Sequence, residues 1–274
     1  MEIIDVTSWE ECLRKFEEIK EIRVNKRNDG MVSSLLYRGQ ENEKWILETT
    51  IERYNKENNQ DISSQGTSLE EYYDNIRNIK AKVESYTQNS WEMEDYKEPK
   101  TLYITSIPGY DYMIYLRHHN YPSPLLDWTR SPYIAAFFAF RNIEKNKDIK
   151  KASIYAYLEY AGSSKSGNAG DVTIFGMGPN VKTHIRHYLQ QCEYTICAKK
   201  IDGNFYYCSH EEGLKSCSEY QDISWKINIP RQEQLKVLDH LNSMNINAYS
   251  LFGSEESLME TLALEEFYLR KENF

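Results

Sequence analysis

The feature of this sequence that most restricts its fold is a helix without a polar face. Ser131-Pro132 is typical of an N-cap followed by proline at the first helical position. It predicts a helix over residues 133–142, where nearly every side chain is apolar. A helix that is apolar on all sides belongs in the middle of a core. The chain is therefore expected to pack other elements around this segment.

The first half of the chain contains three further helix signals. Ser8 with Glu11 and Ser68 with Glu71 form capping boxes, which predict helices that begin after each serine. The first of these helices is expected to end near residue 22. Pro108-Gly109 opens another helix, which the proline-rich stretch at 120–124 must end. Polar stretches at 57–68 and 163–170 are predicted surface loops.

Beyond residue 150 the apolar pattern changes to period two. It predicts strands at 153–160, from about 191, and at 223–229, and Asp202-Gly203 is typical of a hairpin turn. We therefore predict an α+β fold with mixed, mainly antiparallel sheets flanked by helices. No repeat or composition break divides the chain. We expect one domain over residues 1–274, helix-rich at 1–145, strand-rich at 150–250 and closed by a helix at 254–271.

Charge and hydropathy limit the classes of partner. The formal net charge is −9, which disfavours binding to nucleic acid or to anionic membranes. A local basic pocket for a small phosphorylated ligand remains allowed. The sequence contains no apolar run of membrane-spanning length and no basic, apolar leader at its start. The expected location is the cytoplasm, without membrane association.

No metal site is predicted. The five cysteines are an odd number without CxxC pairs, and we expect reduced, mostly buried thiols: Cys12, Cys192, Cys197, Cys208 and Cys217. His118 and His119 are adjacent, so on a helix they point about 100° apart and do not share a metal easily. The sequence also lacks a GxSxG elbow, a GxGxxG loop and a P-loop.

Two segments carry polar groups suited to an anionic ligand. Arg38 ends a predicted strand beside Gly39, where it could hold a phosphate or carboxylate while the glycine lets the ligand approach the backbone. The alternative is a surface salt bridge. Asp127 and its neighbours stand where a buried strand meets the helix N-terminus, which suits an anion. The alternative there is simple helix capping, which fits Ser131 better than Asp127.

A later segment carries a candidate acid. Gln191 and Glu193 are two residues apart at the start of a predicted strand, so they share a face. A carboxylate that faces a developing oxocarbenium is what cleavage of an N-glycosidic bond requires. An exposed pair on an edge strand is the alternative interpretation.

Together these segments resemble the FRG family, which is named for an aromatic-Arg-Gly motif. The resemblance rests on Tyr37-Arg38-Gly39-Gln40 with Trp45, on 116–129 with its Leu-Leu-Asp-Trp-Thr block, on 189–195, and on Ser250-Leu251-Phe252. It departs from the family pattern at Asn120 and Cys192, where glycine is usual, at Pro124, where arginine is common, and at Gly253, where proline is usual. The resemblance extends over nearly the whole chain.

The order of these motifs is also similar to that of ADP-ribosyltransferases, which implies roles for individual residues. Arg38 would hold the pyrophosphate or ribose of NAD, and Gln190 or Glu193 would contact the nicotinamide ribose, although one strand register cannot turn both inward. Tyr194 or Trp128 would stack on a ring. The expected catalytic set is Arg38, Gln190 and Glu193. The expected binding set is Tyr37, Gly39, Gln40, His118, Asp127, Trp128, Thr129, Ser131 and Tyr194.

The function implied by this resemblance is binding of NAD as a substrate, with transfer of ADP-ribose or cleavage of NAD, in a bacterial toxin or phage-defence effector. Its partners would be a small nucleotide and a protein target or antitoxin, with no metal. The alternative is a non-catalytic module that senses a nucleotide or phosphate ligand. A third hypothesis, a protein-interaction domain, would pair Arg38 with Asp127 across a dry core.

Overall fold

The computed structural model describes residues 1–27, 33–58, 67–97, 107–143, 149–159, 171–216 and 222–270. The strands are β1 (Glu2–Asp5), β2 (Leu35–Gln40), β3 (Leu126–Thr129), β4 (Lys151–Glu159), β5 (Thr173–Gly176), β6 (Cys192–Ile201), β7 (Asn204–Tyr207) and β8 (Asp222–Pro230). The α-helices are α1 (Trp9–Arg27), α2 (Thr50–Glu57), α3 (Leu69–Thr87), α4 (Tyr110–His118), α5 (Pro132–Phe140), α6 (Arg186–Leu189), α7 (His210–Ser216), α8 (Gln234–Ser243), α9 (Ala248–Phe252) and α10 (Glu255–Leu264). A 3-10 turn (Arg231–Glu233) precedes α8, and a π-helical turn (Glu265–Leu269) follows α10.

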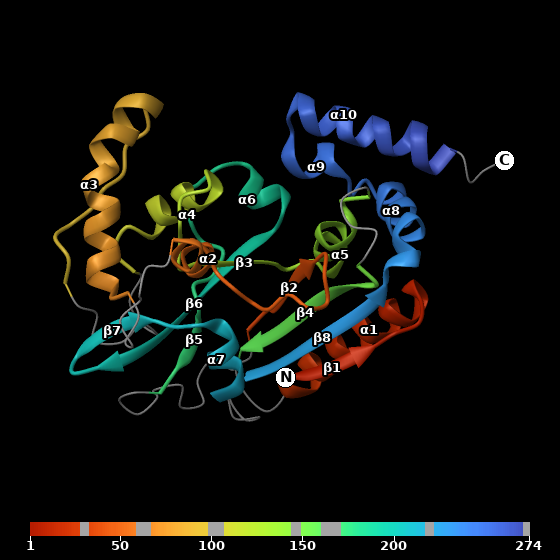
Figure 1. The fold of residues 1–274 in the computed structure, drawn as a ribbon, viewed down its shortest axis with the longest axis horizontal. Coiled ribbons are helices and arrows are strands. Elements are labelled where there is room, and N and C mark those ends of the chain that lie inside the picture. Colours follow the sequence, from red (N-terminus) through yellow and green to blue (C-terminus); the bar gives the residue numbers. More distant parts are fainter. Residues whose placement is uncertain are drawn as a thin grey trace.

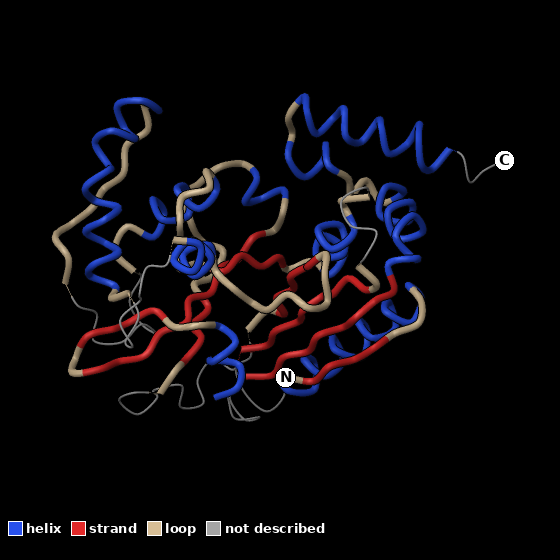
Figure 2. Tube along the Cα trace, viewed as in Figure 1, coloured by secondary structure: helices blue, strands red, loops and turns tan. Residues whose placement is uncertain are grey.

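The described strands form one eight-stranded sheet in the order β1-β8-β4-β2-β3-β6-β5, with β7 paired to β6 (Figure 1). Every pairing is antiparallel except that of β1 with β8. Helices lie along the sheet and over both of its ends, as Figure 2 shows. The predicted α+β class, with a mixed and mainly antiparallel sheet flanked by helices, is confirmed.

Several local predictions are also confirmed. Ser68 and Ser131 cap α3 and α5 by accepting hydrogen bonds from backbone N–H groups. Asp202 and Gly203 both have positive φ, 49° and 94°, as a tight turn between paired strands requires. Asn120, where the family pattern has glycine, has φ 63°, a left-handed conformation that asparagine tolerates. The helix after Ser8 extends to Arg27, five residues beyond the expected end.

Other elements have no counterpart in the prediction: β1, α2, β5, α6, α7 and α9. Each is eight residues or shorter, so its apolar pattern repeats too few times to be recognised. The predicted loop at 163–170, most of the predicted loop at 57–68, and Cys217 lie outside the described residues. Among the described helices, none combines the length and apolar character needed to cross a bilayer.

The half of the sheet formed by β1, β8, β4 and β2 is built around α5. Its core contains alanine, isoleucine, leucine and phenylalanine side chains from α5, from α1 and α8, and from the strands beneath them. Ala135, Ala139 and Phe140 of α5 are 0% exposed. The apolar helix therefore lies in the middle of a core, as the sequence predicts.

Gly39 is where α5 and β2 come closest. A Cβ atom at this position would lie 1.9 Å from the Ala135 carbonyl oxygen and 2.7 Å from the Ala139 nitrogen. No side chain fits between these backbones. The missing Cβ of Gly39 is therefore needed for the packing of α5 on β2. That this glycine, which also lines the pocket described below, admits a ligand stays a prediction.

The other half, formed by β3, β6, β5 and β7, is covered by α3 and α4. Its core contains buried tyrosines, two of which meet edge to face: Tyr72 and Tyr207, with ring centroids 5.9 Å apart. The Tyr72 hydroxyl donates to the Pro122 carbonyl at 2.9 Å. Buried tyrosines need such partners, so this half is held by directed hydrogen bonds as well as by packing.

The two halves meet between β2 and β3, and the junction is short. A single residue pair, Tyr37 with Thr129, is in register across it. Beyond this pair the strands separate, which places Arg38, Gly39 and Gln40 on one side of an opening and Asp127 and Trp128 on the other. We call this opening the seam.

Candidate functional site

A pocket of about 300 Å³ lies at the seam. This volume is at the lower end of the range for small-molecule sites. Its walls contain residues from β2, α2, α4, β3, α5 and the start of β6: Tyr37, Arg38, Gly39, Gln40, Glu41, Trp45, Arg53, His118, Asp127, Trp128, Thr129, Phe138, Gln190 and Cys192. Arg38, His118, Asp127 and Gln190, which are far apart in the sequence, therefore line one pocket.

Arg38 spans the seam. Its Nη1 donates to the backbone carbonyl of Asp127 at 2.6 Å, so the guanidinium takes the place of a strand-to-strand hydrogen bond where β2 and β3 part. Within the described chain its Nε is buried without a partner. Burial lowers the pKa of Arg38 to about 10, against the opposing effect of the Asp127 carboxylate. The side chain is thus cationic at neutral pH and only partly satisfied.

Asp127 forms an ion pair with Arg117, not with Arg38. The Arg117 Nη2 lies 2.6 Å from Asp127 Oδ2, and the two side chains are 13% and 33% exposed. Asp127 Oδ1 is buried without a hydrogen-bond partner in the described part of the chain. The Arg38–Asp127 pair across a dry core, which the protein-interaction hypothesis requires, is therefore not formed.

His118, the last residue of α4, forms part of the pocket wall next to Asp127. Its Nε2 lies 2.8 Å from the Tyr194 hydroxyl. Burial lowers the pKa of His118 to about 4, although the Asp127 charge acts in the opposite direction. The imidazole is therefore neutral at pH 7 and can either donate or accept a hydrogen bond.

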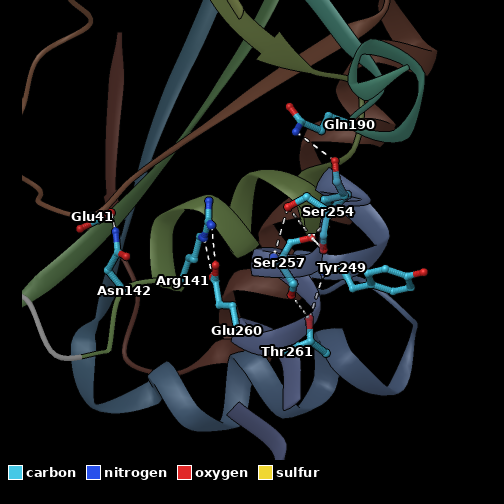
Figure 3. Close-up of polar contacts among 10 residues, drawn as sticks. Glu41, Arg141, Asn142, Gln190, Tyr249, Ser254, Ser257, Glu260 and Thr261 are labelled. Carbon is cyan, nitrogen blue, oxygen red and sulfur yellow. Dashed lines mark hydrogen bonds and ion pairs between the residues drawn. The ribbon is translucent and has the colours of Figure 1, made fainter. Parts of the chain in front are cut away.

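Gln190 lines the pocket, but its side-chain amide already has partners. Nε2 donates to the Leu251 carbonyl of α9 at 3.1 Å, and Oε1 accepts from the Cys192 thiol at 3.8 Å (Figure 3). The Ser250-Leu251-Phe252 segment is thus connected to the pocket wall through Gln190. This residue holds α9 against the pocket, and one amide N–H and one lone pair of its oxygen are used in these contacts.

Glu193 does not belong to the pocket wall formed by the described residues. It points to the other face of β6 and lies opposite Trp128 in the register. Its Oε1 is 3.7 Å from the Arg130 Nε, and burial raises the pKa of this carboxyl despite that neighbour. Of the two alternatives for the nicotinamide ribose, Gln190 lines the pocket and Glu193 does not. Cys192 lines the pocket from the start of β6, and the next strand position, Glu193, faces the opposite side.

The two aromatic rings expected to stack on a ligand are buried. Trp128 is 2% exposed, is stacked with Tyr157, and donates through its indole N–H to Thr195 Oγ1 at 2.8 Å. Tyr194 is 0% exposed and does not line the pocket. Both rings support the walls instead of presenting a face, which corrects the stacking prediction.

Trp45 is the exposed aromatic side chain in the pocket wall, at 48%. Its backbone carbonyl accepts from the Tyr155 hydroxyl at 3.0 Å and from the buried Lys226 Nζ at 3.3 Å. The indole is therefore held on a fixed backbone at the mouth of the pocket. The sequence identifies Trp45 only as a motif residue and predicts no role for it.

The remaining predicted residues have mainly local contacts. Thr129 lines the pocket and accepts from the Ser131 N–H at 3.1 Å, while Ser131 lies outside the pocket wall and caps α5. Gln40 lines the pocket and donates to the Ile46 carbonyl at 2.9 Å. Tyr37 lines it from β2, and burial raises its pKa. Ser131 is thus a helix cap, the alternative already considered for it.

Arg53, Glu41 and Phe138 also line the pocket and were not predicted. Arg53 lies on α2, an element that the sequence analysis missed, and its Nη1 donates to the Glu48 carbonyl at 3.3 Å. Glu41 accepts from Asn142. The signal that could have identified Arg53 is the capping box of Thr49 and Glu52, which begins α2.

The cysteines described by the structure are free thiols: Cys12, Cys192, Cys197 and Cys208. Burial raises the pKa of Cys192 to about 12, so this pocket residue is a protonated thiol and a poor nucleophile. Among the described residues, no three His, Cys, Asp or Glu side chains are grouped so that they could hold a metal ion.

Comparison with known proteins gives a family for part of the chain. Residues 33–148 match the family model of the FRG domain. No curated protein and no solved structure matches the chain. The match contains the pocket residues of β2, α2, α4, β3 and α5, whereas Gln190, Cys192 and the other predicted residues of β6 follow it, so it is shorter than the resemblance suggested. This stretch of the chain is thus similar to the FRG domain.

Proposed function

We propose that the seam pocket binds NAD as a substrate and that the protein cleaves it or transfers its ADP-ribose group. The observation that carries the proposal is the convergence of Arg38, His118 and Asp127 on one pocket from three separate elements. An arginine, an acceptor and a carboxylate at one site suit a ligand that carries both phosphate and sugar groups.

The two sides of the seam pocket differ in the chemistry of their side chains. Arg38 and Arg53 supply guanidinium groups for the phosphates, and Trp45 supplies an exposed ring for stacking on a base. His118 and Asp127 lie on the other side of the seam and suit sugar hydroxyls. A volume of about 300 Å³ encloses about half of a dinucleotide, so the second half would lie over the mouth near Trp45.

Cleavage breaks the bond between the nicotinamide nitrogen and C1′ of the ribose. The electron pair leaves with nicotinamide, and water or an acceptor nucleophile adds to C1′ and loses a proton. A carboxylate stabilises the positive charge that develops on the ribose. Because Glu193 lies outside the pocket, Asp127 takes this role in the proposal. Arg117 holds Asp127 Oδ2, which keeps the carboxylate in place.

The test is incubation of the purified protein with NAD, with nicotinamide release measured by chromatography and NAD binding measured by calorimetry. Arg38→Ala should weaken binding at least tenfold, while Arg77→Ala, which removes an exposed arginine of α3, should leave it unchanged. Asp127→Asn should retain binding and lose turnover. Wild-type protein that neither binds nor cleaves NAD would overturn the proposal.

A second candidate is a module that binds a nucleotide without turning it over and signals its presence. The observation that favours it is that Gln190 is bonded to α9 and that Glu193 is outside the pocket, which leaves fewer groups for catalysis. This candidate expects NAD or ADP-ribose to bind without nicotinamide release. It also expects Asp127→Asn to change affinity alone.

A further inference from the structure

We call the half of the sheet formed by β3, β6, β5 and β7 the Tyr-rich half. A chain of hydrogen bonds connects the pocket to the interior of this half. His118 Nε2 lies 2.8 Å from the Tyr194 hydroxyl, which lies 3.3 Å from His187 Nδ1. His187 Nε2 lies 2.9 Å from the Pro179 carbonyl oxygen. The His187 ring is stacked on Tyr194 with an interplanar angle of 16°. His187 and Tyr194 are 2% and 0% exposed, so water does not compete for these groups.

The direction of each hydrogen bond follows from its fixed end. A carbonyl only accepts, so His187 Nε2 carries a proton and donates to Pro179. Burial lowers the pKa of His187, which leaves Nδ1 as a lone pair that accepts from the Tyr194 hydroxyl. Tyr194 has one proton, and burial raises its pKa, so its oxygen must accept from His118. The Cys192 thiol also lies beside this hydroxyl, but sulfur is the weaker acceptor.

His118 is thereby held in one of its two neutral forms, with the proton on Nε2 and the lone pair on Nδ1. Among the described residues Nδ1 has no hydrogen-bond partner, and it is not among the buried unsatisfied atoms, so it is open to the space that His118 lines. The opposite arrangement would turn the lone pair of His187 Nδ1 toward the lone pairs of the Tyr194 oxygen. Such a contact is unfavourable in a buried site.

We propose that Tyr194 and His187 are positioning residues that fix His118 as a hydrogen-bond acceptor in the pocket, so that His118 Nδ1 selects a ligand with a hydroxyl or amide N–H at that point. The inference rests on the proposed function for the identity of the ligand. It adds that the wall formed by α4 and β3 recognises hydrogen-bond donors, whereas the arginines across the seam recognise the anion. The ligand class is thus a phosphorylated compound with a free sugar hydroxyl or carboxamide beside the phosphate-binding side.

The protonation state can be measured without any ligand. In a neutral imidazole the two nitrogens have separate 15N resonances, one for N–H and one for the lone pair. Protein labelled with 15N-histidine at pH 8 should show His118 with the proton on Nε2. His240 is an internal standard for this form, because its Nδ1 accepts from the Trp9 indole N–H at 2.8 Å. The His118 signal is assigned by its loss in His118→Asn.

Tyr194→Phe tests the chain itself. Removal of the hydroxyl takes away the acceptor of His118 Nε2, so the His118 resonances should move toward an average of the two neutral forms. Tyr86→Phe, at a tyrosine that is 91% exposed, should leave them unchanged. A wild-type His118 with its proton on Nδ1, or resonances that Tyr194→Phe does not move in a folded protein, would overturn the inference.

Two substitutions of His118 then test recognition of the ligand by calorimetry with NAD. Glutamine places its amide near Nε2 and can keep the contact with Tyr194, but it has no group at the Nδ1 position. Asparagine places its amide oxygen near Nδ1. His118→Gln should weaken NAD binding about tenfold, which corresponds to the loss of one hydrogen bond. His118→Asn should weaken NAD binding less. Equal affinities for the two variants would contradict the selection step.

The outcomes separate the two proposals. If wild-type protein does not bind NAD but His118 carries its proton on Nε2, the function fails and the positioning inference stands. If NAD binds but the proton is on Nδ1, the function stands and the inference fails.

Discussion

The two halves of the sheet reach stability in different ways. In the core around α5, the buried side chains are almost all alanine, aliphatic residues, phenylalanine or tryptophan, and Tyr37 is the one buried tyrosine that the described residues of that cluster contain. The described residues of the core under α3 and α4 contain four: Tyr72, Tyr112, Tyr194 and Tyr207. Aliphatic packing is non-directional, whereas buried hydroxyl groups favour partners at fixed positions, as those of Tyr72 and Tyr194 have. The second half therefore specifies the orientation of polar groups that the first half does not contain.

This difference is most visible at the seam. The half formed by β1, β8, β4 and β2, which we call the α5 half, contributes Arg38. This cation is held against the backbone carbonyl of Asp127. The Tyr-rich half contributes Asp127 and His118, each held by a side chain behind it, namely Arg117 and Tyr194. A packed scaffold on one side and a hydrogen-bonded scaffold on the other thus supply opposite chemistry to one pocket.

The largest expected effect tests the tight packing of the α5 half. Gly39→Ala places a Cβ atom 1.9 Å from the Ala135 carbonyl, and backbone must move to admit it. We expect a loss of about 3 kcal/mol in the free energy of unfolding, measured by urea titration, because overpacking is costly in a dense core. Gly178→Ala is the matched control, since its φ is +69° and nothing lies within 4 Å. It should lose about 1 kcal/mol from backbone strain alone. Equal losses would mean that α5 can shift.

The next effect tests the hydrogen-bonded side of the seam. Asp127→Asn leaves the mostly buried Arg117 without its ion-pair partner. We expect a loss of about 2 kcal/mol in unfolding free energy, below the value for a fully buried pair because Asp127 is partly exposed. The control, Asp95→Asn, breaks the exposed Arg77–Asp95 pair and should change stability by less than about 0.5 kcal/mol. If the two variants were equally stable, Arg117 would be solvated without its partner.

A smaller effect is expected where the C-terminal helices join the α5 half. Arg141, at the end of α5, forms two hydrogen bonds with Glu260 of α10 (Figure 3). Its guanidinium lies 4.4 Å from the Phe252 ring centroid. Glu260→Gln should cost about 1 kcal/mol, because both side chains are partly exposed. Amide hydrogen exchange in α9 and α10 should become faster. Glu266→Gln, which breaks an exposed pair with Arg270, should not change exchange in α9.

The last effect is a pH dependence of the Tyr-rich half. Burial lowers the pKa of His118 to about 4 and that of His210 to about 3, both from 6.5. Below pH 6.5 the unfolded chain binds protons that the folded protein does not bind. The contribution of these histidines to the free energy of unfolding is therefore complete above pH 6.5 and is lost as the pH is lowered toward 4. Amides of β6 should exchange faster at pH 5 than at pH 7.5, relative to those of β8. His210→Asn should reduce the slope of unfolding free energy against pH. An unchanged slope would show that His210 takes up its proton equally in the folded and the unfolded chain.

Much of the fold is readable from local sequence. Ser68 and Ser131 cap the helices that follow them, and Asp202-Gly203 forms the turn between β6 and β7. Such signals act within a few residues, so they do not depend on the rest of the chain. The short elements were missed, because an eight-residue helix such as α2 and a four-residue strand such as β5 form only against partners distant in sequence.

The candidate site was predictable in part. Arg38 and Asp127 were identified as polar residues at element ends, and His118 and Gln190 were identified through the family resemblance. All four line the pocket. The sequence did not show that Asp127 pairs with Arg117, that Gln190 is bonded to α9, or that Trp45 is the exposed ring. These facts depend on which element lies across the seam. Glu193 illustrates the limit, because one residue of register decides between the pocket and the opposite face.

The sequence by itself determined that an apolar helix must be buried in a core with a mixed sheet. It also determined which polar residues stand at the ends of the strands. That information is local, since periodicity and caps act over one or two turns. Only the tertiary structure decided that β2 and β3 share a single pair before they separate, and hence that a pocket exists between Arg38 and Asp127. Separation of two strands is a property of the packing on either side of them, and no segment of the chain contains it alone.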